Sequence, residues 1–467
     1  MTSSDFDVIV IGGGPSGYAT ALTAAAADLS VALIERDRLG GTCLHRGCIP
    51  AKELLETASV HRTVSQADQF GIMTAAPVVD FSAAQDRKQA AVDRLFKGIT
   101  NLVESKNIEL FSGTGNLTKD RRIAVQMDDG VEQLLTGASI VLAAGSQSKT
   151  LPGFEIDGRT ILGSDDVLTM TSLPESAAVI GGGAIGCEFA SMLADLGTEV
   201  TILEADERLV PGADADIAKA LQRSFKKRGI KTLTGVTAVG HTPMVHETTL
   251  QLSDGAEIEV QKIIVCIGRR PYTEHLQLAE TSVEVDDQGF VRVDEFCRTN
   301  LDGIYAVGDL IATPQLAHVG FAEAMLVVSD ITGEPRAPID YSKVPWAIYC
   351  HPEIAYAGLS EEQAKADGYE ISVSQHRFIG NARALIHNDT EGMVKLVAER
   401  REDGKAGKLL GVHLIGPWAT EQLGQGYLAI NRDIEISEIA DFVQPHPTLS
   451  ELFGEAALEL AGRTLHG

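Results

Sequence analysis

The chain has 467 residues, of which 44% are hydrophobic and 22% charged, a composition typical of a globular protein with a large core and three or four domains. A formal net charge of −26 argues against nucleic acid and against an anionic membrane surface as partners, because both are bound by basic surfaces. Six cysteines are too few for a disulfide scaffold at this length. We find no signal peptide, no apolar run of membrane-spanning length and no metal-ligand cluster, so we expect a cytoplasmic protein without a metal.

The N-terminal part predicts a dinucleotide-binding site. A short apolar strand leads into a G-x-G-x-x-G motif at 12–17, an alanine-rich helix and a second apolar strand that ends at Glu35. In this pattern Gly12 permits a tight turn, Gly14 lets the backbone approach a pyrophosphate, and Gly17 allows the helix to pack closely. The helix N-terminus faces the phosphates, and Glu35 can bind a ribose hydroxyl.

The next segment predicts a dithiol that opens and closes. Cys43 and Cys48 are five positions apart, with His45 and Arg46 between them. On a regular helix their Cα atoms would be roughly 8.7 Å apart, whereas a disulfide needs about 4.4–6.8 Å. A bridge therefore requires a distorted turn, which Gly47 and Pro50 can supply. Nearby cations favour the thiolate, which is the reactive form.

Three other interpretations of the two cysteines remain open at this point. They could be buried core residues, a structural disulfide or half of a zinc site. A zinc site usually has a second cysteine pair, which we do not find, and a structural disulfide is rare in a reducing compartment. We favour the redox interpretation. The other four cysteines are scattered, and we expect them to be core residues without chemistry.

The segment 40–52, Gly-Gly-Thr-Cys-Leu-x-x-Gly-Cys-Ile-Pro-x-Lys, resembles the active-site segment of the flavoprotein disulfide reductases. This family includes dihydrolipoamide dehydrogenase, glutathione reductase, mycothione reductase and mercuric reductase. The resemblance implies that the first nucleotide site holds FAD, that Cys43 exchanges with the substrate and that Cys48 lies next to the flavin. It also implies that Lys52 pairs with Glu188 beside the flavin.

A second G-x-G-x-x-G motif, with Gly181, Gly183 and Gly186, follows another apolar strand and leads to a strand that ends at Glu204. The middle glycine lies 204 − 183 = 21 residues before the acid here and 35 − 14 = 21 residues before it in the first copy. Two complete fingerprints imply two dinucleotides, and the resemblance assigns the second to a nicotinamide cofactor. A carboxylate repels the 2′-phosphate of NADP, so Glu204 predicts NAD.

Four further segments outside the two fingerprints complete the nucleotide domains. A β-rich run over 98–145 ends at Gly145, where the chain closes over the cofactor. Gly268 lies in the segment that closes the second nucleotide domain. The resemblance implies that Asp309 reaches the ribityl chain of FAD and that Ala317 lies near the flavin.

The C-terminal part mixes strands and helices without a nucleotide fingerprint, and it resembles the dimer-forming domain of the family. It ends with a histidine between two prolines, His446, and with Glu451 five residues later. The simpler interpretation is a loop histidine and a helix capping box from Thr448 to Glu451. The resemblance implies instead that His446 moves protons for the cysteines of the partner subunit and that Glu451 orients it.

The sequence thus predicts an α/β fold with two Rossmann-like dinucleotide-binding domains and a C-terminal α+β dimerisation domain. The expected parts are 1–148 (FAD, first part), 149–272 (NAD), 273–343 (completing the FAD site) and 344–467 (interface). The reaction implied is NAD-dependent oxidation of dihydrolipoamide by a homodimer that meets the lipoyl domains and E2 subunit of 2-oxoacid dehydrogenase complexes. Two alternatives are an NAD(P)H-dependent reductase of another small disulfide, like mycothione or glutathione reductase, and a flavoprotein that reduces quinones without the dithiol.

Overall fold

The computed structural model of the protein describes residues 5–466, which form two compact units. Of the described residues, unit 1 comprises 5–53, 82–149 and 268–341, and unit 2 comprises 54–81, 150–267 and 342–466. Each unit is therefore assembled from three separate stretches of chain. Among the helices described, none is long and apolar enough to cross a membrane.

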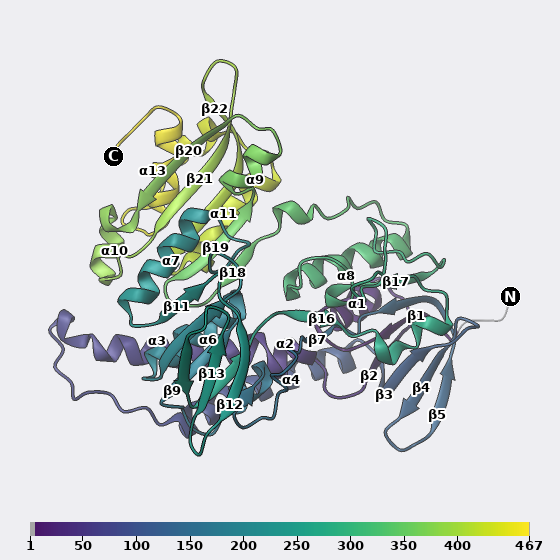
Figure 1. The fold of residues 1–467 in the computed structure, drawn as a ribbon. Helices are drawn as coiled ribbons and strands as arrows, with labels where there is room; N and C mark the ends of the chain where they lie inside the picture. The colour runs from purple at the N-terminus through teal and green to yellow at the C-terminus, as the bar shows by residue number, and fades with distance from the viewer. Residues whose placement is uncertain (1–4, 467) are drawn as a thin grey trace. The chain divides into compact units, whose positions relative to one another are not determined.

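Unit 1 is built around a seven-stranded sheet with the order β17-β6-β1-β2-β3-β4-β5. The strands from β17 to β3 are parallel, and β4 and β5 continue the sheet as antiparallel strands. The helices α1 and α8 pack side by side on this sheet (Figure 1). The elements that lie wholly or mostly in unit 1 are β1 (Phe6–Ile11), α1 (Pro15–Ala26), β2 (Val31–Glu35), α2 (Gly41–Arg46), α4 (Phe81–Ser105), β3 (Glu109–Leu117), β4 (Ile123–Met127), β5 (Glu132–Leu135), β6 (Gly137–Leu142), β7 (Ser146–Ser148), β16 (Arg269–Pro271), β17 (Ile304–Ala306) and α8 (Ala317–Thr332).

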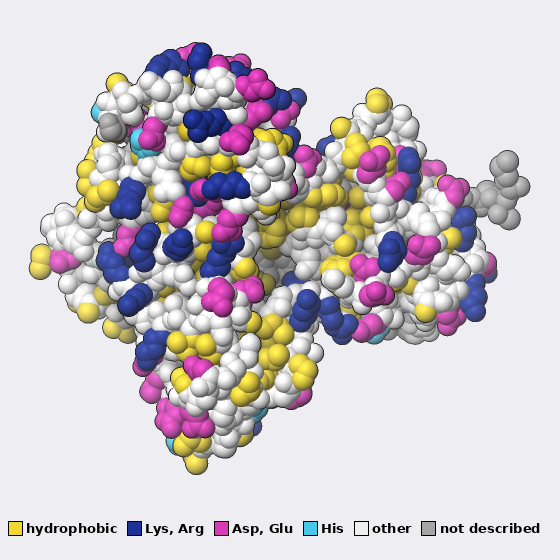
Figure 2. All heavy atoms as spheres, turned by 45° about the horizontal axis from the view of Figure 1, so that its top comes forward, with side chains coloured by type: hydrophobic (Ala, Val, Ile, Leu, Met, Phe, Trp, Pro, Cys, Tyr) yellow, Lys and Arg dark blue, Asp and Glu magenta, His cyan; other side chains and the backbone are white. Residues whose placement is uncertain are grey.

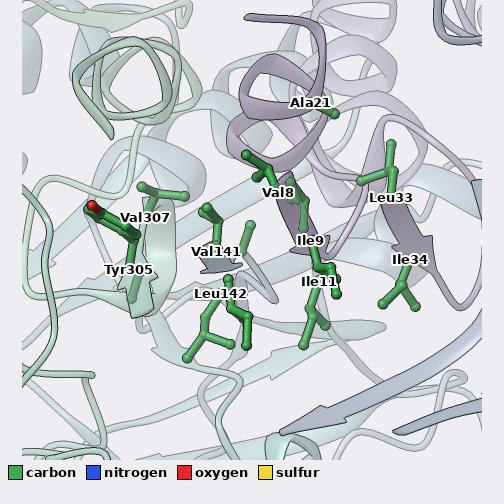
Figure 3. Close-up of a cluster of buried hydrophobic side chains, with 14 of the residues drawn as sticks. Val8, Ile9, Ile11, Ala21, Leu33, Ile34, Val141, Leu142, Tyr305 and Val307 are labelled. Carbon is green, nitrogen blue, oxygen red and sulfur yellow. The ribbon is translucent and has the colours of Figure 1, made fainter. Parts of the chain in front are cut away.

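The core of unit 1 lies between this sheet and its helices. Figure 3 shows side chains of β1, β2, β6 and β17 meeting in one apolar cluster, with Val8, Ile9, Leu33, Val141 and Leu142 among them. All five of these side chains are fully buried. Strands buried on both faces read as continuous apolar runs, which is why the sequence indicated β1, β2 and β6 so clearly. The parallel strands align their carboxyl ends at one edge, where the loops of the first fingerprint lie.

Unit 2 contains three sheets. A parallel sheet has the order β11-β10-β9-β15-β8, a small antiparallel sheet has the order β12-β13-β14, and a larger antiparallel sheet has the order β18-β19-β22-β21-β20. The helix α3 (Cys48–Ser65) runs through residues of both units. The other elements of unit 2 are β8 (Ile161–Leu162), α5 (Ser164–Thr169), β9 (Ser176–Ile180), α6 (Ala184–Asp195), β10 (Glu199–Glu204), α7 (Ala215–Lys227), β11 (Lys231–Thr234), β12 (Ala238–Pro243), β13 (Thr248–Leu252), β14 (Glu257–Val260), β15 (Lys262–Val265), β18 (Trp346–Ile348), β19 (Glu353–Gly358), α9 (Glu361–Ala366), β20 (Ile371–Arg377), α10 (Ala382–His387), β21 (Met393–Arg400), β22 (Ala406–Gly416), α11 (Ala419–Asn431), α12 (Ile436–Ala440) and α13 (Glu451–Leu460).

The predicted fold class is confirmed: both dinucleotide-binding sheets and a C-terminal α+β part are present. One detail was wrong. The β-rich run expected over 98–145 begins only at Glu109, because α4 continues to Ser105. The amphipathic pattern of α4 keeps one face of this helix buried, with Val92 and Val103 in the core. On the face drawn in Figure 2, acidic and basic side chains are interspersed over the surface.

Candidate functional site

The first fingerprint forms a phosphate-binding turn between β1 and α1. Gly12 has a φ of +107°, and a Cβ there would lie 2.3 Å from the carbonyl oxygen of Ala143 at the end of β6. A Cβ at Gly17 would lie 1.7 Å from the carbonyl oxygen of Gly12, so only glycine lets α1 approach the turn. At Gly14 a Cβ would meet no protein atom within 4 Å, so this backbone is open to a ligand. These are the properties that a pyrophosphate site requires.

Glu35 supports the same turn. One oxygen of its carboxylate accepts a hydrogen bond from the amide of Gly13 at 2.6 Å, and the other accepts from the amide of Asp37 at 2.8 Å. The carboxylate is therefore fixed at the end of β2, directly beside the glycine turn. This is the position from which an acid can bind a ribose hydroxyl.

The second fingerprint repeats this geometry in unit 2. Gly181 has a φ of +109°, and a Cβ at Gly186 would lie 1.9 Å from the carbonyl oxygen of Gly181. A Cβ at Gly183 would meet no atom within 4 Å, as at Gly14. The carboxylate of Glu204 accepts from the amide of Gly182 at 2.6 Å and from that of Asp206 at 2.8 Å. The two nucleotide sites are thus built alike, down to the contacts of the acid.

Arg208 is the nearest arginine to Glu204 in sequence, and it is occupied elsewhere. Its guanidinium donates to both carboxylate oxygens of Glu362, at 3.1 and 2.9 Å. This two-point pairing raises the pKa of Arg208, with the hydrogen bonds to Glu362 as the largest cause. An arginine held in this way does not offer its charge to a 2′-phosphate, which agrees with the preference for NAD that Glu204 predicts.

The redox segment is a broken helix. α2 ends at Arg46, Gly47 leaves the helical conformation with φ −148° and ψ −112°, and α3 begins at Cys48. A disulfide joins Cys43 to Cys48, whose Cα atoms are 4.7 Å apart. The break at Gly47 therefore supplies the distortion that the spacing demanded. Pro50 lies in the first turn of α3, where proline is tolerated.

Neighbouring side chains hold this segment in place. A ring nitrogen of His45 lies 2.8 Å from the carbonyl oxygen of Leu39, and the ring packs edge-on against Phe96. Arg46 forms an ion pair with Asp37 at 2.7 Å. The disulfide is thus tied to the end of β2, where the first nucleotide site lies.

A cavity in unit 1 adjoins the first fingerprint. The residues that line the cavity are Ile11, Gly12, Gly14, Ile34, Glu35, Arg36, Asp37, Gly41, Thr42, Arg46, Gly113, Thr114, Gly115, Ala143, Ala144, Ser146, Tyr272, His275 and Leu276. Thr42 and Arg46 flank Cys43, so the cavity reaches the redox segment. The glycine turn, the acid and the open backbone fit the nucleotide part of FAD.

Asp309 belongs to a polar cluster that the sequence did not indicate. The hydroxyl of Ser146 donates to the carboxylate of Asp309 at 2.5 Å, and the guanidinium of Arg269 donates to that hydroxyl at 2.7 Å. Arg269 also lies 3.9 Å from the Asp309 carboxylate. The cluster brings together the ends of β7, β16 and β17, and Ser146 lines the cavity as well. The only sequence signal for Arg269 was its position just after Gly268.

A buried glutamate, Glu323 on α8, was also missed. Its carboxylate accepts hydrogen bonds from the amide of Gly308 at 2.6 Å, the hydroxyl of Thr313 at 2.8 Å and the hydroxyl of Tyr341 at 3.1 Å. Burial raises the pKa of Glu323, and these hydrogen bonds oppose the rise. The glutamate fixes the turn that carries Asp309. A charged residue within a largely apolar helix was the signal available.

The remaining predicted FAD residues, Gly145 and Ala317, and the predicted NAD residue Gly268 all lie in unit 1. Gly145 has a φ of +73°, and its carbonyl oxygen accepts from the amide of Tyr272 at 2.9 Å. Ala317 is the first residue of α8, so its amide belongs to a helix N-terminus. Gly268 has a φ of +100° and accepts a hydrogen bond from the amide of Lys149 at 3.0 Å.

Lys52 and Glu188 belong to different units, so their predicted pairing stays a prediction. Glu188 lies on α6 with only 5% of its surface exposed, and its carboxylate accepts from the amide of Tyr349 at 2.9 Å. Within unit 2 this bond ties α6 to the strand β18. Lys52 lies in the first two turns of α3, four residues after Cys48.

His446 and Glu451 form a pair in unit 2. The Nδ1 atom of His446 lies 2.8 Å from one carboxylate oxygen of Glu451, and the other oxygen accepts from the amide of Thr448 at 2.7 Å. The side chain of His446 is 70% exposed and that of Glu451 is 18% exposed. An exposed imidazole held by a half-buried carboxylate leaves Nε2 free to face a reactant. Of the expected capping box, only the hydrogen bond from the amide of Thr448 to Glu451 is present. The N-cap of α13 is Ser450 and not Thr448.

The other four cysteines are free thiols that form no disulfide. Burial raises the pKa of the thiols of Cys187, Cys266, Cys297 and Cys350, to about 12 for Cys266. They stay protonated at neutral pH and are poor nucleophiles. The residues described contain no cluster of histidine, cysteine or acidic side chains that could hold a metal ion.

The chain is similar to known proteins over its whole length. Residues 6–324 match the family described as pyridine nucleotide-disulphide oxidoreductase, and residues 344–457 match the dimerisation domain of that family. A dihydrolipoyl dehydrogenase of Bacillus subtilis is 38% identical over 99% of this chain and 100% of its own length. One of Zymomonas mobilis is 37% identical over 99% of each chain. The crystal structure of LpdA from Mycobacterium tuberculosis superposes with a TM-score of 0.91 at 26% identity, covering 97% of this chain and 99% of that one.

The two nucleotide turns, the disulfide beside the first of them and the C-terminal dimerisation domain agree with this similarity. The predicted resemblance is confirmed, and with it the cofactors FAD and NAD. The chain belongs to the pyridine nucleotide-disulphide oxidoreductase family.

Proposed function

We propose that this protein oxidises dihydrolipoamide to lipoamide with NAD⁺, as the dihydrolipoamide dehydrogenase (E3) component of a 2-oxoacid dehydrogenase complex. The observation that carries the proposal is the Cys43–Cys48 disulfide, which is flanked by residues that line the FAD cavity. The substrate follows from the relatives named dihydrolipoyl dehydrogenase, which this chain matches from end to end. NAD as acceptor follows from the fixed carboxylate of Glu204.

In the proposed reaction His446 of the partner subunit is the base. Its Nε2 atom takes a proton from one thiol of dihydrolipoamide, and the hydrogen bond that Nδ1–H donates to Glu451 orients the ring and stabilises the imidazolium. The resulting thiolate attacks the sulfur of Cys43, the Cys43–Cys48 bond breaks, and Cys48 leaves as a thiolate. The second substrate thiol then releases its proton to solvent and attacks the substrate sulfur of the mixed disulfide. Lipoamide departs, and Cys43 becomes a thiolate.

The substrate has now lost two electrons and two protons, and the protein holds a reduced cysteine pair. FAD, when bound, supplies the two-electron path from this pair to NAD⁺, which takes up two electrons and one proton as NADH. We propose that Lys52 and Glu188 lie beside the flavin, and that Gly145, Asp309 and Ala317 contact FAD. Gly12, Gly14, Gly17 and Glu35 then bind its nucleotide part, and Gly181, Gly183, Gly186, Glu204 and Gly268 bind NAD.

The dimer is part of the proposal because His446 acts on the other subunit. The chain carries a dimerisation domain over 344–457. Close to His446, Phe442 is 68% exposed and Val443 is 95% exposed. Apolar side chains this exposed are typical of a surface that a second copy covers. The start of the second family match at residue 344 supports the last of the four parts proposed from the sequence, which are 1–148, 149–272, 273–343 and 344–467. The cytoplasmic location and the association with lipoyl domains and E2 stay predictions.

The test is anaerobic reduction of NAD⁺ by dihydrolipoamide, beside NADPH-driven reduction of a set of small disulfides. We expect rapid NADH formation that Cys43→Ser abolishes. Cys297→Ala is the matched control, since it removes a buried thiol elsewhere in unit 1 and should retain activity. Slow NADH formation together with fast NADPH-dependent turnover of another disulfide would refute the substrate and the role of Glu204 while keeping the cysteine chemistry.

A further inference from the structure

The cavity of unit 1 has one wall made of three planar side chains. Arg36 follows Glu35 at the end of β2, whereas Tyr272 and His275 follow β16, more than two hundred residues later. All three line the cavity together with the glycine turn. The return segment after β16 therefore meets the end of β2 at the nucleotide site.

Direct contacts join these side chains. The guanidinium of Arg36 donates to the hydroxyl of Tyr272 at 2.6 Å, and its central carbon lies 4.3 Å from the centre of the Tyr272 ring. The rings of Tyr272 and His275 stack with their centres 4.7 Å apart and an angle of 29° between their planes. The amide of Tyr272 donates to the carbonyl oxygen of Gly145 at 2.9 Å, which fixes the tyrosine backbone. Tyr272 is thus the central member of the group, anchored on one side and in contact with both other side chains.

The position of this wall indicates which part of FAD it meets. Gly12 and Gly14 have the geometry of the pyrophosphate turn, and Glu35 has the position of the ribose acid. Arg36 is the next residue after that acid, so the wall lies at the adenosine end of the cofactor. Aromatic rings and guanidinium planes are the groups that proteins use to hold a nucleobase through its flat face.

We propose that Tyr272 is a cofactor-positioning residue that holds Arg36 and His275 against the adenosine half of FAD and slows the loss of the cofactor. The contact between Arg36 and Tyr272 joins the end of β2 to the segment after β16, so the nucleotide is retained between two parts of unit 1 that are distant in sequence. Tyr272 touches no reacting atom. Its effect is on how long the protein keeps FAD.

The experiment measures FAD release from the holoenzyme after dilution, by the rise in flavin fluorescence. Tyr272→Phe removes only the hydroxyl that accepts from Arg36, and we expect release about threefold faster. Tyr272→Ala also removes the ring that contacts Arg36 and His275, and we expect about tenfold. The matched control is Phe296→Ala, which deletes another ring of unit 1 that lies under an arginine, 5.0 Å from Arg298, and should leave FAD release unchanged.

A second measurement separates a role at adenosine from general loosening of the fold. ADP competes with FAD during rebinding and contacts only the nucleotide half. We expect Tyr272→Ala to weaken the binding of ADP and the binding of FAD by the same factor. Unchanged FAD release, or faster release with an unchanged inhibition constant for ADP, would overturn the proposal. Neither measurement involves a thiol substrate, so a result that overturns the role of Tyr272 would not affect the proposed function. Failure of the NAD⁺ reduction assay would likewise not affect the role of Tyr272.

Discussion

A buried lysine in unit 2 gives the most demanding test of these contacts. The side chain of Lys395 on β21 is 1% exposed, and its ammonium group donates to Asp214 at 2.9 Å, Asp216 at 2.8 Å and Glu361 at 2.8 Å. These three acids come from the start of α7 and the start of α9. We consider Lys395→Met, which keeps an unbranched side chain of similar length and removes the charge.

The expected loss of stability follows from the exposure of each acid. The side chain of Asp214 is also 1% exposed, so it would be left as an unpaired charge in a buried site. Breaking a buried ion pair in this way costs about 3–5 kcal/mol. The side chains of Asp216 and Glu361 are 34% and 30% exposed, so water solvates them and each adds at most about 1 kcal/mol. We therefore expect Lys395→Met to lower the free energy of unfolding of unit 2 by about 3–7 kcal/mol, most of it from Asp214.

The loss should also depend on pH. Burial raises the pKa of Asp214, but hydrogen bonding to Lys395 and other contacts outweigh it and leave the pKa below its ordinary value. Hydrogen bonds, from Lys395 to Asp216 and from Lys365 and Lys395 to Glu361, lower the pKa of these two acids. Acids with a depressed folded pKa stabilise the protein above their unfolded pKa, near 4, and lose that effect as the pH falls through the folded pKa. The difference between wild type and variant should be constant from about pH 6 to 8 and shrink below about pH 4.

The assay is urea unfolding followed by tryptophan fluorescence. The chain has two tryptophans, Trp346 and Trp418, and both lie in unit 2, so the signal reports on that unit. Lys365→Met is the matched control, because Lys365 pairs with the same Glu361 but is 60% exposed. We expect it to change stability by less than about 0.5 kcal/mol. A Lys395→Met loss below 1 kcal/mol, or one that does not shrink in acid, would refute the reasoning.

Three further predictions concern the site. His446→Gln should lower the rate of dihydrolipoamide oxidation by about 10²–10⁴-fold with unchanged flavin content, because it removes the proposed base, which Glu451 holds. A rate near wild type in steady-state assays would contradict this. Glu204→Ala should raise the ratio of kcat/KM for NADP to that for NAD at least about tenfold, since the repelling carboxylate is lost, and an unchanged ratio would show that another group sets the preference. Gly17→Ala should yield protein without bound flavin, measured by absorbance, because the Cβ would clash with the carbonyl of Gly12. Gly98→Ala, at a helical site where a Cβ meets no atom within 4 Å, should keep its flavin and is the control.

Features that depend on short stretches of chain could be predicted from the sequence. Each fingerprint is a strand, a glycine turn and a helix within about thirty residues, and the glycines are required by close backbone contacts that repeat in both copies. The spacing of Cys43 and Cys48 predicted that a bridge between them needs a distorted turn, and the structure has that distortion at Gly47. The two dinucleotide-binding sheets followed from the same local patterns, because a strand buried on both faces shows a continuous apolar run, whereas the C-terminal dimerisation domain followed from the resemblance. The start of the β-rich run was misplaced, since the end of α4 depends on packing that spacing does not reveal.

Contacts between distant stretches required the folded chain. The pair of Arg36 and Tyr272 joins residues 236 positions apart, and Lys395 meets acids up to 181 positions away. The cluster of Asp309, Ser146 and Arg269 likewise depends on how β7 and β16 pair. No local pattern specifies such neighbours, because strand order and register are set by burial of whole sheets and not by any one residue. The chemistry of each motif is local, whereas the side chains that we propose to position the cofactor, and those that stabilise the units, come together only when the sheets assemble.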